Sequence, residues 1–92
     1  MSNIDIRRKH PHSLKRAKAA VNETAEAMRE KFDIESAWSG NTLKFSRSGV
    51  EGRIKVTDDE IHVTAELGFL LGMLKPSIER EIERHLDQHF KK

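Results

Sequence analysis

Residues 61–81 read IHVTAELGFLLGMLKPSIERE, and the residue pattern changes twice along this stretch. Apolar and polar residues alternate from Ile61 to Leu67, which is typical of a strand with one buried and one solvated face. The run up to Leu74 is apolar apart from two glycines. Beyond Pro76 the apolar residues recur every four positions, which is a helical period. The stretch therefore predicts a strand and an amphipathic helix joined by an apolar connector.

Two helices are predicted from apolar residues spaced three or four positions apart. The first is expected to follow Ser13, a suitable N-cap, and its apolar face comprises Leu14, Ala17, Val21, Ala25, Met28 and Phe32. The second is expected after Pro76, with Ser77 as its cap and an apolar face made of Ile78, Ile82, Leu86 and Phe90. Both helices need an apolar surface to cover.

Strands are predicted wherever the period is two. Short alternating runs occupy residues 4–6, 34–38, 43–45, 50–56 and 61–67, with turn residues between the later ones. Gly52 is expected to mark a bulge, because a glycine inside a strand often does so. Strands joined by short turns pair antiparallel, and two amphipathic helices can cover one face of their sheet.

The predicted fold is a single α+β domain over residues 1–92. It is a two-layer sandwich in which an antiparallel sheet of about four strands carries two helices on one face. The expected order is strand, helix, three or four strands in hairpins, helix. A chain of 92 residues can build only one small core.

Composition excludes several classes of protein. The chain is 36% hydrophobic and 35% charged, too apolar for a disordered tail and too charged for a membrane protein. It contains no cysteine, so disulfides, thiolate metal sites and thiol nucleophiles are excluded. The N-terminus lacks the apolar core of a secretion signal, and the apolar run ending at Leu74 is too short to span a bilayer. A cytoplasmic location is expected.

Several segments resemble a known family. They are IDIRRKH at 4–10, FSRSGVEG at 45–52, AELGFLLG at 65–72 and KPSIE at 75–79. Together with the Ala-rich first helix, they resemble the small bacterial polyhydroxyalkanoic acid system proteins over nearly the whole chain. The resemblance implies a cytoplasmic protein associated with polyester storage granules, whose surface is apolar polymer with an amphiphilic coat. It supplies no catalytic residues.

The apolar connector is the first candidate site. Some of its side chains are expected to complete the core under the last helix, and any surplus would form a patch of the kind that marks interaction sites. The interface is predicted at Phe69, Leu70, Leu71, Met73 and Leu74. A homodimer is the expected assembly, because a one-sided sheet can complete its burial against a second copy.

The second candidate is a cationic segment at residues 7–18, which holds six basic residues and no acid. The rest of the chain has 11 basic and 15 acidic residues, so its net charge is about −4. Such a cluster is either a solvated face or an anion- or partner-binding site at a helix start, where free N–H groups converge. Its residues are Arg7, Arg8, Lys9, Lys15, Arg16 and Lys18.

Metal, cofactor and catalytic roles are not expected. His85 and His89 are four positions apart and His10 and His12 share a loop, but no further metal ligand is identifiable. No nucleophile elbow or phosphate-binding loop is present in the sequence. The predicted function is a non-catalytic, granule-associated binding or regulatory protein. The alternative is a small basic domain that binds RNA or the ribosome.

Overall fold

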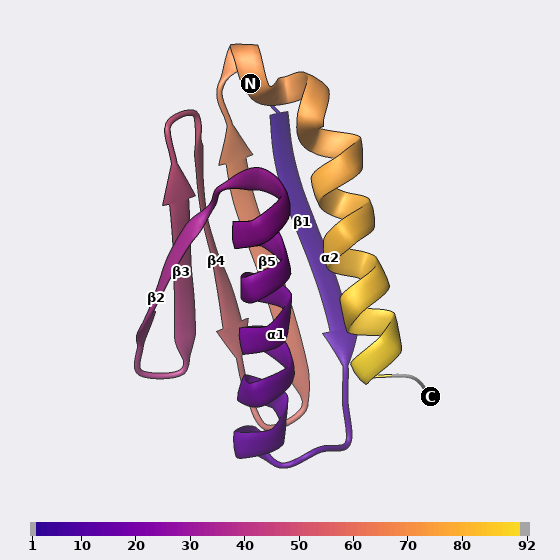
Figure 1. Ribbon diagram of the computed structural model, residues 1–92. Helices are drawn as coiled ribbons and strands as arrows, with labels where there is room; N and C mark the ends of the chain where they lie inside the picture. Colours follow the sequence, from indigo (N-terminus) through magenta and orange to yellow (C-terminus); the bar gives the residue numbers. More distant parts are fainter. Residues whose placement is uncertain (1, 91–92) are drawn as a thin grey trace.

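A computed structural model of the chain describes residues 2–90, apart from the side chains of Ser2 and Leu70. It contains a five-stranded sheet with two helices on one of its faces (Figure 1). The elements in chain order are β1 (Ser2–Lys9), α1 (Leu14–Phe32), β2 (Glu35–Ser39), β3 (Thr42–Arg47), β4 (Val50–Val56), β5 (Glu60–Leu67), the 3-10 helix η1 (Phe69–Leu74) and α2 (Lys75–His89). The predicted α+β sandwich is confirmed.

The sheet has five strands rather than about four. The least evident strand in the sequence is β2, whose residues 35–37 are all exposed, so that little burial shapes their pattern. Backbone pairing with β3 holds it in the sheet, with Ala37 opposite Lys44 and Trp38 opposite Leu43. Four strands in hairpins therefore follow α1, the larger of the two numbers expected.

All neighbouring strands are antiparallel, in the order β1-β5-β4-β3-β2. The N-terminal strand lies beside β5, with Ile4 opposite Ala65 and Ile6 opposite Val63. This pairing brings the first and last strands together and puts these four side chains on the face that the helices cover, because side chains alternate between the faces of a strand.

Helix α1 has the predicted bounds for local reasons. The hydroxyl of Ser13 accepts a hydrogen bond from the Arg16 backbone N–H at 3.2 Å, which confirms Ser13 as the N-cap. At the other end Asp33 takes a left-handed conformation, with φ 59°, and its N–H bonds to the Arg29 carbonyl at 3.0 Å.

Helix α2 begins earlier than predicted, at Lys75, and the prediction of Ser77 as its cap is wrong. The 3-10 turns of η1 run directly into α2, so the chain does not break before the helix. The Lys75 N–H bonds back to the Gly72 carbonyl, and no side chain caps this end. Pro76 lies in the first turn, where its missing N–H costs nothing.

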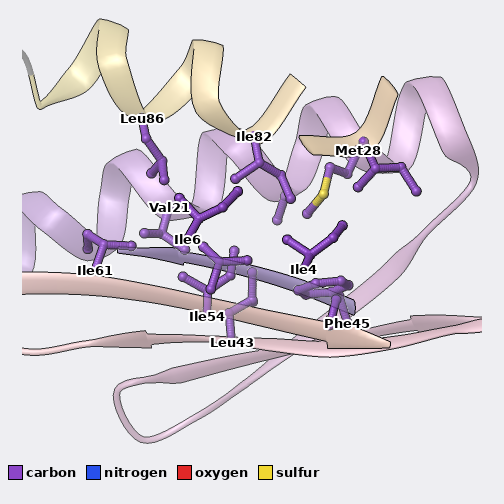
Figure 2. Close-up of a cluster of buried hydrophobic side chains, with 14 of the residues drawn as sticks. Ile4, Ile6, Val21, Met28, Leu43, Phe45, Ile54, Ile61, Ile82 and Leu86 are labelled. Carbon is purple, nitrogen blue, oxygen red and sulfur yellow. The ribbon is translucent and has the colours of Figure 1, made fainter. Parts of the chain in front are cut away.

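The core fills the space between the helices and the covered face of the sheet (Figure 2). Val21 and Met28 of α1 and Ile82 and Leu86 of α2 pack toward strand residues that are almost fully buried. The strand residues include Ile4, Ile6, Leu43, Phe45, Ile54 and Ile61. The opposite face of the sheet carries polar residues.

The predicted bulge at Gly52 is wrong, because pairing continues without interruption through it, with Phe45 on one side and Ala65 on the other. Gly52 has a packing role instead. A Cβ atom there would lie 2.6 Å from Cζ of Phe45 and 2.6 Å from the Thr64 carbonyl oxygen. The absent side chain makes room for the Phe45 ring.

We expect Gly52→Ala to lower the free energy of unfolding by about 1–3 kcal/mol, the usual cost of overpacking a core. The reason is that the Thr64 carbonyl belongs to the backbone and cannot move aside alone. Gly68→Ala is the matched control, because Gly68 has φ −66° and a Cβ there would meet its nearest atom at 3.6 Å. Urea denaturation of both variants measures the difference; equal stabilities would contradict the packing role.

Candidate functional site

The connector η1 lies beyond the end of β5, at the same end of the molecule as the β3–β4 turn (Figure 1). The Gly68 N–H donates to the Gly49 carbonyl at 2.7 Å and so fixes the start of η1 against that turn. Leu71 packs over Gly49, where an added Cβ would lie 2.7 Å from the leucine Cδ1. Gly49 also has φ +89°, so glycine is needed there for two reasons. The connector is therefore held in place at both its backbone and its side chains.

The structure divides the predicted interface residues. Phe69 is 89% exposed and Met73 is 88% exposed, and both are large apolar side chains. Leu71 and Leu74 are partly buried and pack against the core. The side chain of Leu70 lies outside the described residues. Part of the connector thus completes the core and part of it faces solvent, while its role as an interface stays a prediction.

Three cations of the predicted basic site lie on β1 and point to two different faces. Arg7 and Lys9 are on the uncovered face of the sheet, where they pair with Glu60 at 3.3 Å and Asp59 at 4.0 Å. Arg8 is on the other face and contacts α2, with Asp87 at 3.1 Å and Glu83 at 3.5 Å. Arg8 thereby ties the edge strand to the C-terminal helix.

The other three cations lie at the start of α1. Lys15 and Arg16 are exposed in its first turn. Lys18 reaches the β2–β3 turn, where its ammonium donates to the Gly40 carbonyl at 3.1 Å and lies 4.8 Å from the ring centre of Trp38. The six residues thus occupy three places, and the structure does not gather them into one patch.

A buried carboxylate between the helices was not predicted. Glu81 of α2 is 8% exposed at its side chain and accepts hydrogen bonds from Lys31 of α1 at 2.9 Å, Arg84 at 2.8 Å and His85 at 2.9 Å. Burial alone would raise the pKa of Glu81, but the bonds from Lys31, His85 and Arg84 outweigh it and hold the pKa below its ordinary value. The sequence signal was the spacing of Glu81 from Arg84 and His85, at three and four positions.

The histidines serve packing and hydrogen bonding. His10 is buried, its Nε2 donates to the Thr57 carbonyl at 2.9 Å and its Nδ1 accepts from the His12 N–H at 3.1 Å. Both rings lie against Phe90. His89 lies 3.8 Å from Glu23 of α1. Among residues 2–90, no three metal-ligating side chains gather as a metal would need.

The fold and these contacts define a class: a small two-layer α+β sandwich with one uncovered sheet face and an exposed apolar connector at one end. A family model described as "Putative polyhydroxyalkanoic acid system protein" matches residues 4–90. The chain belongs to this family, which confirms the resemblance seen in its sequence. No curated protein and no solved structure matches it. Within residues 2–90, neither helix has the length and apolar character needed to cross a membrane.

We expect Glu81→Gln to lower the free energy of unfolding at neutral pH by about 1–2 kcal/mol, because charge-assisted hydrogen bonds between the helices are weakened. A carboxylate whose pKa is depressed on folding stabilises the protein above its unfolded pKa, and this contribution is lost as the pH falls through the folded pKa. The difference between wild type and variant should therefore shrink in acid. Urea denaturation at a series of pH values measures it.

Glu79→Gln, on the same helix, is the control and should change stability by no more than about 0.5 kcal/mol. A difference between wild type and Glu81→Gln that stays constant from neutral to strongly acidic pH would contradict the ionic role of Glu81.

Proposed function

We propose that this protein is a non-catalytic binding protein of the cytoplasmic polyhydroxyalkanoate granule, and that the connector η1 contacts the granule surface. The observation that carries the proposal is the joint exposure of Phe69 and Met73 on η1, in a chain whose family belongs to the polyhydroxyalkanoate system. A granule presents apolar polymer under an amphiphilic coat, which suits two apolar side chains on a fixed support.

The expected strength of this contact follows from the area involved. Burying a Phe or a Met side chain contributes roughly 1.5–3 kcal/mol, so the pair supplies about 3–6 kcal/mol before the costs of association. Single molecules would therefore exchange on and off the surface. Such reversible contact fits a binding or regulatory role better than permanent anchoring.

A binding role is also supported by what the titratable clusters do. The buried carboxylate of Glu81 is saturated by three donors that join α1 to α2. Both nitrogens of His10 are engaged by the backbone. These groups stabilise the fold, and their hydrogen bonds would have to break before they could act on a substrate.

The test is co-sedimentation of Phe69→Asp/Met73→Asp with isolated granules. We expect binding to weaken by about a hundredfold or more, because the apolar contact is replaced by two charges. Circular dichroism should show an unchanged fold, since both side chains are exposed. Ala19→Asp/Gln88→Glu is the control: both positions are exposed on the helices and the added charge is the same. Equal binding by wild type and the η1 variant would refute the proposal.

A separate measurement tests the RNA-binding alternative. Lys15 and Arg16 are exposed at the start of α1, and their replacement by Gln should leave granule binding unchanged if η1 is the contact. Binding to RNA or ribosomes that falls steeply with salt, and that this double variant loses, would favour the alternative function instead.

A further inference from the structure

The uncovered face of the sheet carries side chains in straight rows across the strands, because the pairing register is continuous in all five. One row contains Asn3, Glu66, Glu51, Ser46 and Glu35. The next contains Asp5, Thr64, Arg53, Lys44 and Ala37, and the third contains Arg7, His62, Lys55, Thr42 and Ser39. The first two rows, with His62 and Lys55 of the third, line a broad, open concavity of about 1050 Å³.

Charge is segregated between these rows. The first row, here called the acidic row, has three glutamates and no cation. The second and third, here called the basic rows, hold Arg53, Lys44, Arg7 and Lys55 against a single acid, Asp5. The acidic row lies at the η1 end of the sheet, since Glu66 is next to the last residue of β5. These three rows are therefore dipolar along the strand direction, whereas the row beyond them, Lys9 opposite Glu60, carries one charge of each sign.

This segregation works against the stability of the isolated sheet. Glu51 lies directly opposite Glu66, and Lys44 lies directly opposite Arg53. Like charges directly opposite each other on adjacent strands are destabilising. A pair with one acidic and one basic residue at the same two positions would have been favourable. These like-charge pairs lower the stability of the monomer. A partner bound to this face could compensate for that cost by bringing opposite charges to both rows.

The charges at the middle of the face are also unsatisfied within the described chain. Near β1, Asp5 pairs with His62 at 2.9 Å and Arg7 pairs with Glu60 at 3.3 Å. In contrast, the six charged residues on β2–β5 that make up the segregated rows have no oppositely charged partner within 4.0 Å among residues 2–90. They are Glu35, Lys44, Glu51, Arg53, Lys55 and Glu66.

We propose that the occupant is a second copy of this chain, stacked face to face through the uncovered sheet. A two-fold axis parallel to the strands would place each acidic row on the acidic row of the partner. A two-fold axis running across the strands reverses one copy end for end and places each acidic row on a basic row of the partner. The second arrangement is self-complementary, as an isologous interface requires.

Other occupants fit this face less well. A nucleic acid or another polyanion would be repelled by the acidic row, which lies one row away from Lys44 and Arg53. An apolar partner would find only Ala37 among the side chains of the three rows. The proposed pairing uses both signs of charge at once.

This inference does not depend on granule binding. In the dimer the two η1 connectors point in opposite directions, because the two-fold axis reverses one copy end for end, and η1 contributes no residue to the three rows. The variant Phe69→Asp/Met73→Asp should therefore remain dimeric, which separates this interface from self-association through η1.

The test uses two complementary variants. Glu51→Lys/Glu66→Lys gives the acidic row a net positive charge, and Lys44→Glu/Arg53→Glu gives the adjacent basic row a net negative charge. All four side chains are exposed, so both variants should keep the wild-type circular dichroism spectrum. Sedimentation equilibrium at low salt should show a wild-type dimer that dissociates as salt is raised, and each variant alone should have a dissociation constant at least about a hundredfold weaker.

An equimolar mixture of the two variants should form a heterodimer, because each face then meets its opposite. A wild-type protein that stays monomeric at low salt overturns the proposal. So does a dimer that survives in either variant alone, or a mixture that fails to associate.

Discussion

The pairing of β1 with β5 is the contact on which the rest of the structure depends. It brings the first strand beside the last one, although a helix and three strands separate them in sequence, and it fixes the order of the sheet. Once β1 is in place, both α1 and α2 must cross the same face, because each follows a strand whose apolar side chains point there. Arg8 strengthens this closure by joining β1 to Asp87 and Glu83 of α2.

The same pairing explains why the sheet has one dry and one wet face. Ile4 and Ile6 meet Ala65 and Val63 under the helices, and the intervening residues of both strands are polar. A shift of one residue would put every apolar side chain of β1 into solvent, so the register is strongly determined. The polar rows of the uncovered face are a consequence of that register.

Much of the fold could be predicted from the sequence because the signals are local. Ser13 and Asp33 set the ends of α1, and the alternation in residues 61–67 is clear enough to place β5. The start of α2 could not be predicted, since it depends on η1 leading into the helix without a break. The role of Gly52 could not be predicted from the sequence, because a glycine is needed there to make room for the ring of Phe45, which comes from a neighbouring strand.

The candidate sites also divide into features that could be predicted from the sequence and features that could not. The sequence shows an apolar connector with more apolar side chains than the small core can cover. The exposure of Phe69 and Met73 follows from this surplus. The dispersal of the basic residues could not be predicted from the sequence, because it depends on which face of the sheet or helix each residue occupies. The network around Glu81 also needs the tertiary structure, since Lys31 comes from the other helix.

The position of η1 at one end has a geometric consequence for any layer of these molecules. The domain measures 37 × 25 × 21 Å, and its long dimension follows the strands and helices (Figure 1). Attachment of single molecules through the η1 end would stand each one upright on a cross-section of about 25 × 21 Å, whereas a molecule lying flat would cover about 37 × 25 Å. An upright orientation admits nearly twice as many molecules per unit of surface and leaves the opposite end, closed by Phe90 and His10, facing the surroundings.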